Sequence, residues 1–119
     1  LEQAHQAVEL SIPAIAIFPS IDASLKDLSG SLAQDGNNLV CRAVRALKSA
    51  YPDLGIVCDV ALDPFTDHGH DGVMKAEEIL NDETVKILCQ QAIHHNRTSY
   101  IEYIFQLRGE AKPRSALHL

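Results

Sequence analysis

Residues 54–72 read LGIVCDVALDPFTDHGHDG and join an apolar run to an acidic one. The first part, through Leu62, is rich in Val, Ile and Leu and follows the helix breaker Pro52, which is the pattern of a buried strand. The second part places aspartates and histidines around two glycines, which is the composition of a loop. We therefore expect a strand over about 55–63. The acidic stretch 59–72 begins inside this strand and runs out of its carboxyl end, and it is called the acidic loop below.

A second apolar run, residues 12–18, reads IPAIAIF and is followed by a proline. This pattern favours another strand, buried on both faces as in a parallel sheet. Apolar residues at helical spacing occur before this run, between it and the acidic loop, and after that loop, and Asn37 or Asn38 is placed to cap the middle helix. The expected elements are strands over about 12–18 and 55–63 and helices over about 2–11, 37–50 and 82–93. Strands that alternate with helices at this spacing predict an α/β fold with parallel strands, as an open sheet or a barrel.

The acidic loop leaves its strand at the carboxyl end, where parallel α/β folds bind their ligands. Alternate residues of an extended chain face the same side, so Asp59, Ala61 and Asp63 are expected to project together. The turn at the two glycines allows Asp71 to fold back onto them. Carboxylate oxygens favour Mg²⁺ or a monovalent cation, and His70 adds an imidazole beside them. The alternative on this spacing is a solvated turn in which Asp and Gly serve loop geometry alone.

The composition excludes two classes of partner. The chain has a formal net charge of -6 over 119 residues, which argues against a nucleic-acid partner because phosphate neutralisation needs clustered Lys and Arg. It contains no run of about 18 apolar residues, so no membrane partner is expected. The first residues lack the basic start and apolar core of a signal peptide, so we expect a protein that is soluble and not secreted.

Three cysteines, Cys41, Cys58 and Cys89, are widely spaced and each sits among apolar residues. An odd number at such spacing predicts buried free thiols rather than a disulfide or a zinc site. Free thiols imply a reducing compartment. A bacterial cytoplasm is the expected localisation, with a plastid as the alternative.

Four blocks occur in a specific order: IPAIAIFP at 12–19, NLVCRAVRALK at 38–48, PDLGIVCDVALDPFTDHGHDG at 52–72 and ILNDETV at 79–85. Together they make residues 1–93 resemble the porphobilinogen synthase family, also called δ-aminolevulinic acid dehydratase. The resemblance implies a TIM-type (β/α)8 barrel, of which this chain supplies a fragment, and usually a homo-octamer. It also implies the condensation of two molecules of 5-aminolevulinate into porphobilinogen for tetrapyrrole (heme) synthesis.

The resemblance implies roles for the acidic loop. In zinc-dependent members of the family, three cysteines bind a catalytic zinc at the positions of Ala61, Asp63 and Asp71, so this chain resembles the aspartate-rich branch, for which no catalytic zinc is expected. By the same matching, Asp59 lies at a substrate-binding position and His70 lies beside the metal position. Asp63 and Asp71 are the expected ligands of Mg²⁺ or a monovalent cation, which Ala61 leaves with one ligand fewer and partly hydrated.

The family chemistry depends on two lysines that form Schiff bases with the substrate, and both lie beyond the region of resemblance. Residues 94–119 do not match the family, and the expected SDMMDGR-like block is absent from them. Lys86, on an ordinary helix position, and Lys112, in the unmatched tail, are not expected to replace the catalytic amines. We therefore expect a truncated chain with a foreign or frame-shifted end that is inactive alone.

Two alternatives remain open. The chain is a non-enzymatic fragment or small α/β interaction module, or it is a stand-alone Mg²⁺-binding domain. The aromatic run at 100–105 bears on the first, since three alternatives are open for it: a strand that covers the sheet edge, a helix on the sheet, or a disordered, aggregation-prone tail. His94 and His95 are expected near a helix C-terminus, where cations are favoured.

Overall fold

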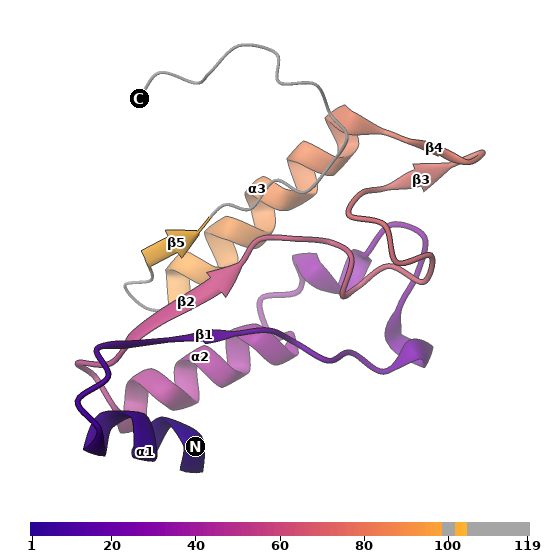
Figure 1. Cartoon of the computed structure of the whole chain (residues 1–119). Helices are drawn as coiled ribbons and strands as arrows, with labels where there is room; N and C mark the ends of the chain where they lie inside the picture. The colour runs from indigo at the N-terminus through magenta and orange to yellow at the C-terminus, as the bar shows by residue number, and fades with distance from the viewer. Residues whose placement is uncertain (99–101, 105–119) are drawn as a thin grey trace.

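The computed structural model describes residues 1–98 and 102–104, and it is an α/β structure (Figure 1). Three parallel strands form the sheet in the order β1-β2-β5, and the register pairs Ile17 with Cys58. The strands are β1 (Ala14–Ile17), β2 (Gly55–Asp59) and β5 (Glu102–Ile104), and the helices are α1 (Glu2–Glu9), α2 (Leu39–Ala50) and α3 (Asn81–Thr98). The expected parallel α/β architecture is confirmed.

The helices begin and end near the expected positions, with local reasons for each difference. Asn38, rather than Asn37, caps α2, because its side-chain oxygen accepts the backbone N–H of Cys41 at 3.0 Å. α1 stops before residue 11, where Ser11 adopts a positive φ of 57° that ends the helix. α3 runs to Thr98, beyond the expected end at 93, because no glycine or proline interrupts the segment.

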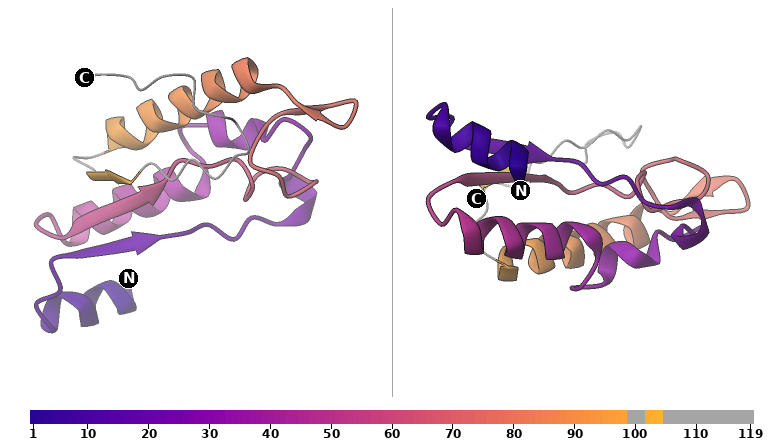
Figure 2. Two further views of the ribbon diagram at one scale, coloured as in Figure 1. Left: turned by 45° about the horizontal axis from the view of Figure 1, so that its top comes forward. Right: turned by 90° about the horizontal axis from the view of Figure 1, so that it is seen from below.

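The core lies between the sheet and the pair α2 and α3, which pack side by side on one face (Figure 2). Val44 and Leu47 of α2 meet Ile56 and Cys58 of β2 there. Near the carboxyl ends of the strands, Leu62, Phe65 and other residues of the acidic loop close the same core. The loop is therefore anchored by apolar side chains, while Asp63, Asp67 and His70 are exposed.

The expectation that the first strand is buried on both faces is wrong. Ile15 and Ile17 pack against the core, but Ala14 and Ala16 are exposed. α2 and α3 cover only one face of the sheet, and within the described residues no layer covers Ala14 and Ala16 on the other. Both strands are also shorter than expected, since regular pairing stops at Ile17 and Asp59.

The cysteines are free, but the expectation that all three are buried is wrong for one of them. Cys41 and Cys58 are buried, and burial raises the pKa of the Cys58 thiol to about 12. Cys89 is exposed on α3, where it shares one helix face with the exposed residues Val85 and Ile93, four positions before and after it.

The histidines of α3 also differ from expectation. His94 and His95 lie inside a helix that continues to Thr98, so they do not mark its C-terminus. His95 is fully buried, and burial, with the nearby His94, lowers its pKa to about 4. The imidazole of His95 is therefore neutral near neutral pH and does not serve as a helix-end cation.

The connections contain elements that were not expected. Two short 3-10 helices, η1 (Ala23–Leu25) and η2 (Ser31–Gln34), lie in the loop after β1. A hairpin of β3 (Met74–Lys75) and β4 (Glu78–Ile79) projects from the body (Figure 1). Among the described helices, none has the length and apolar character needed to cross a membrane.

The aromatic run at 100–105 falls partly within the described residues. Glu102–Ile104 form β5, which pairs in parallel with β2, so these three residues take the strand alternative. The rest of that run, and Lys112, lie outside the described residues.

Candidate functional site

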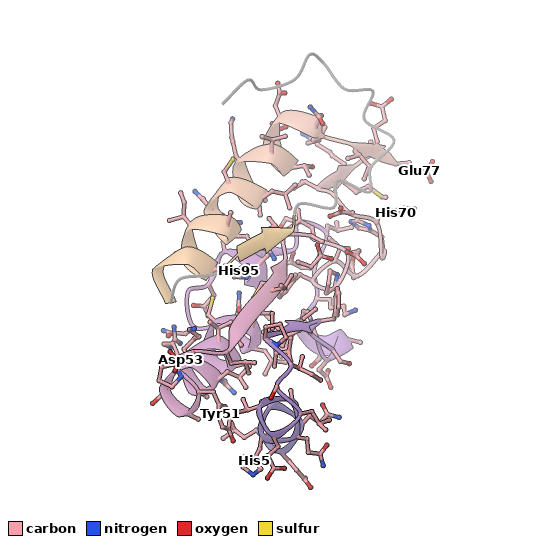
Figure 3. The ribbon with its side chains drawn as sticks, turned by 60° about the vertical axis from the view of Figure 1, so that its left-hand side comes forward. His5, Tyr51, Asp53, His70, Glu77 and His95 are labelled. Atoms are coloured by element: carbon pink, nitrogen blue, oxygen red, sulfur yellow. The ribbon has the colours of Figure 1, made fainter. Side chains whose placement is uncertain are left out.

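A hollow of about 480 Å³ opens at the carboxyl ends of β1 and β2. The expected site residues all reach it, although they come from different parts of the loop. Its lining consists of Phe18, Asp59, Ala61, Asp63, Gly69, His70 and Asp71. Figure 3 shows His70 and the hairpin residue Glu77 at this end of the molecule, away from His5 and Tyr51. The structure therefore brings together the residues for which the sequence predicted substrate and cation binding.

The hollow follows from the strand register. Because Ile17 pairs with Cys58, Phe18, the first residue after β1, lies beside Asp59, the last residue of β2. The chain then turns, with the Leu62 carbonyl accepting the N–H groups of Phe65 and Thr66 at 2.8 and 3.0 Å. Thr66 Oγ1 donates to the His70 carbonyl at 2.8 Å, which returns the chain toward the strand ends. The turns of the acidic loop thus bring residues 69–71 close to residues 59–63.

The Asp71 carboxylate in the hollow is held by a backbone hydrogen bond. Its Oδ1 accepts the Leu62 backbone N–H at 2.6 Å, and the side chain is half-buried. Burial raises the pKa of Asp71, the Leu62 hydrogen bond opposes that rise, and the negative charges of Asp63 and Asp59 add to it. Asp71 therefore binds a proton more readily than a free aspartate, and a nearby cation would favour its ionised form.

The two histidines of the loop have different surroundings. Their rings stack with centroids 5.5 Å apart, and the backbone N–H of His70 donates to His68 Nδ1 at 3.1 Å. Since Nδ1 accepts, the neutral tautomer of His68 carries its proton on Nε2, which lies 3.2 Å from the Leu28 carbonyl. His68 therefore supports the loop, while His70 lines the hollow.

The loop after β1 holds the acidic loop in place, and sequence reasoning missed its central residue, Asp27. Its backbone N–H donates to the Phe65 carbonyl at 3.3 Å, and its carbonyl accepts the Asp67 N–H at 3.2 Å. Its carboxylate accepts hydrogen bonds from Ser31 and Ser29, which lower its pKa to about 2, with the Ser31 hydroxyl contributing most. The Asp-x-Ser-x-Ser pattern of residues 27–31 is the signal that identifies such a turn.

The donor set at the hollow consists of carboxylate and imidazole groups. The Ala61 side chain has no ligating atom, and the Cys58 thiol is buried in the core with a raised pKa, so the site does not present the thiolates of a zinc centre. Within residues 1–98 and 102–104, no three His, Cys, Asp or Glu side chains are grouped so as to hold a metal ion. The arrangement fits, at most, a hydrated cation held by few protein ligands.

This combination defines a class of protein: a parallel α/β segment with a polar hollow at the carboxyl ends of its strands, the place where such folds bind ligands. The family model described as Delta-aminolevulinic acid dehydratase matches residues 1–100. The chain belongs to the δ-aminolevulinic acid dehydratase (porphobilinogen synthase) family.

Curated relatives agree with this assignment. The chain is 56% identical over 93 residues to Delta-aminolevulinic acid dehydratase of Bradyrhizobium diazoefficiens, covering 78% of this chain and 26% of the relative. It is 44% identical over 94 residues to the chloroplastic enzyme of Glycine max, covering 78% of this chain and 23% of that relative. The chain thus spans about a quarter of the length of these relatives.

A solved structure shows the same fold. The crystal structure of δ-aminolevulinic acid dehydratase from Toxoplasma gondii, in complex with the reaction product porphobilinogen, matches with a TM-score of 0.79 and 39% identity. The match covers 82% of this chain and 28% of that one. The expected fold, part of a TIM-type barrel, is confirmed.

Proposed function

We propose that this chain carries one side of a porphobilinogen synthase active site, which condenses two molecules of 5-aminolevulinate into porphobilinogen. The observation that carries the proposal is the convergence of Asp59, Asp63, Asp71 and His70 on one hollow at the carboxyl ends of the strands. A family member at 39% identity has been solved with porphobilinogen bound, which supports this assignment of substrate and product.

Each group has a chemical task in this proposal. Asp59, at the end of β2, binds 5-aminolevulinate, whose ammonium group is the natural partner of a carboxylate. Asp63 and Asp71 would hold a hydrated Mg²⁺ or monovalent cation, with His70 beside them as a hydrogen-bonding group. Such a cation would supply positive charge that organises the second substrate. Within the chain itself, the aspartates provide the oxygen atoms and the Leu62 N–H fixes one of them.

The isolated chain is proposed to bind without turnover, because no lysine of the described residues lines the hollow. Lys86 is exposed on α3, and Lys48 Nζ donates to the Pro52 and Leu54 carbonyls at the opposite ends of the strands. Without an amine at the hollow, the substrate ketone has no nucleophile with which to form a Schiff base.

The assignment to the aspartate-rich branch, without a catalytic zinc, rests on Asp63 and Asp71. A homo-octamer, as the family resemblance implies, is proposed for the whole protein. We also propose a bacterial cytoplasmic location, with a plastid as the alternative, because relatives include a bacterial protein and proteins named as chloroplastic.

The binding test is a titration of the ¹⁵N-labelled 119-residue chain with 5-aminolevulinate, followed by NMR. We expect saturable shifts at the amides of Asp59, Asp63 and Asp71, and a loss of affinity of about tenfold in Asp59→Asn, which removes a charge-assisted contact. Asp53→Asn is the matched control, because Asp53 is an exposed aspartate just before the same strand. Absent shifts, or equal affinity in Asp59→Asn, would reject the substrate role.

Two further readouts complete this test. Adding Mg²⁺ alone is expected to shift the Asp63 and Asp71 amides in the parent chain and not in the double variant Asp63→Asn/Asp71→Asn. Formation of porphobilinogen by the purified chain would contradict the proposed inactivity.

The second candidate, a non-enzymatic α/β interaction module, is favoured by one observation. Glu102–Ile104 lie beyond the matched residues and nevertheless pair with β2 as a third parallel strand. A folded chain that gives no response to 5-aminolevulinate in the same titration would favour this candidate.

A further inference from the structure

Helix α3 holds the acidic loop through two buried polar side chains. Gln91, which is 1% exposed, donates from Nε2 to the Ala61 carbonyl at 3.1 Å. Thr84, two turns earlier on the helix and 6% exposed, accepts the Val73 N–H at Oγ1 at 2.9 Å. One contact lies near the start of the loop and the other directly after its end. The helix therefore fixes both ends of the segment that carries Asp63, His70 and Asp71.

Gln91 and Asp71 form hydrogen bonds to the same peptide group. The carbonyl of the Ala61–Leu62 peptide accepts from Gln91, and the N–H of that peptide donates to Asp71 Oδ1 at 2.6 Å. A peptide group whose carbonyl accepts a hydrogen bond is polarised and becomes a stronger donor at its N–H. The two hydrogen bonds thus form a chain that runs from Gln91 on α3, through the Ala61–Leu62 peptide, to the Asp71 carboxylate at the hollow.

The orientation of the Gln91 amide is determined by this contact. With the opposite orientation, Oε1 would face the Ala61 carbonyl, and two acceptors would be opposed. In the observed orientation, Oε1 is buried and meets no donor among the described residues. A buried acceptor without a partner costs stability, so an apolar side chain of similar shape would serve packing better. We infer that a glutamine occupies this position because its Nε2 donates to the Ala61 carbonyl.

We propose that Gln91 is a positioning residue of the site, which acts through the Ala61–Leu62 peptide to hold the Asp71 carboxylate at the hollow. This role rests on the proposed function, because positioning Asp71 matters only if the hollow binds a ligand. Gln91 does not line the hollow, so its effect reaches the hollow only through the peptide.

The test uses NMR of the ligand-free 119-residue chain and compares Gln91→Met with Gln90→Met. Methionine keeps the length of the side chain and removes both the donor and the buried acceptor, while Gln90 is an exposed glutamine on the same helix. In Gln91→Met, the Leu62 amide proton is expected to move upfield and its hydrogen exchange to accelerate about five- to tenfold, the factor that one hydrogen bond is worth. Gln90→Met should leave both unchanged.

A conservative variant separates positioning from packing. Gln91→Glu is expected to keep its acid protonated because of burial, and its hydroxyl then donates to the Ala61 carbonyl. The Leu62 amide should return toward its parent position in this variant. Failure to return, or an unchanged Leu62 amide in Gln91→Met, would overturn the proposal.

The parent chain provides an answer if Gln91→Met does not fold. A scalar coupling across the hydrogen bond, between Gln91 Nε2 and the Ala61 carbonyl carbon, is expected, and its absence would overturn the proposal. All of these measurements are made without 5-aminolevulinate. A failure to bind that substrate would therefore reject the proposed function and leave the structural role of Gln91 to be judged separately.

Discussion

Asp27 and Thr66 pair through an isolated parallel β-bridge, which joins the loop after β1 to the acidic loop after β2. The bridge couples the two loops that form the rim of the hollow. It depends on the turn that the Asp27 carboxylate makes with Ser29 and Ser31. The stability of this turn therefore bears directly on the geometry of the site.

Replacement of Asp27 by Ala is expected to destabilise the chain by about 1 kcal/mol, a value reduced for solvent screening because the side chain is only partly buried. The pKa of Asp27 is lowered from 3.8 to about 2 on folding, so its stabilising contribution is present above about pH 4 and is lost as the pH falls toward 2. Urea denaturation at pH 7 and at pH 2 measures both effects. The difference between parent and variant should be smaller at pH 2, where about half of the Asp27 carboxylates of the folded chain are protonated. Asp22→Ala is the control, because Asp22 makes similar bonds to Ser24 but is exposed and makes no such bridge.

Gly55 is required where β1 and β2 approach most closely. A Cβ at this position would lie 2.8 Å from the Ala14 Cβ and 3.1 Å from the Pro13 carbonyl oxygen. Gly55→Ala is expected to cost about 1–3 kcal/mol of unfolding free energy, since the strands would have to separate. A double-mutant cycle with Ala14→Gly provides the control, because it removes the Ala14 Cβ. If the cost is the same with and without that methyl group, the clash is not its cause.

The β3–β4 hairpin has a turn whose residues do not suit its backbone. Ala76 and Glu77 have φ of 49° and 67°, the combination of a type I′ turn, which favours Asn and Gly. The double replacement Ala76→Asn/Glu77→Gly is expected to stabilise the chain by about 1–2 kcal/mol, because each left-handed residue carries a penalty on the order of 1 kcal/mol. Thermal unfolding measures the gain. Glu78→Gly, in the adjacent strand, should instead lower the melting temperature.

The free cysteines differ in accessibility, so they should differ in reaction rate. Cys89 is exposed and is expected to react with iodoacetamide in the native chain. Cys41 and Cys58 are buried, and the pKa of Cys58 is raised to about 12, so both should react only after unfolding. Mass spectrometry of native and urea-treated samples counts the labels. Modification of Cys58 in the native chain at a rate comparable to Cys89 would contradict this packing of β2 against α2.

Much of the site could be predicted because it depends on neighbours in sequence. The strand that begins at Gly55, an asparagine cap at residue 37 or 38 and the acidic loop after the strand follow from apolar runs, breakers and local hydrogen bonds within a few residues. The end of β2 at Asp59, rather than at residue 63, did not follow from them. The family resemblance then indicated roles for Asp59, Asp63, Asp71 and His70, and their common hollow agrees with the strand order.

The remaining features depend on where distant segments meet. The contacts of Asp27 with the acidic loop and of Gln91 with Ala61 are made by side chains and peptides far apart in the chain. The exposure of Cys89, and of Ala14 and Ala16, depends on which faces the helices cover.

The sequence by itself determined the alternation of helices and strands and the position of the acidic loop, because helical period, strand pattern and capping are local properties of the chain. Only the tertiary structure decided which polar groups hold that loop and which apolar residues stay exposed. The physical reason is that a hydrogen bond such as that of Gln91 forms only after packing has brought two distant segments within about 3 Å. No pattern in either segment alone specifies its partner.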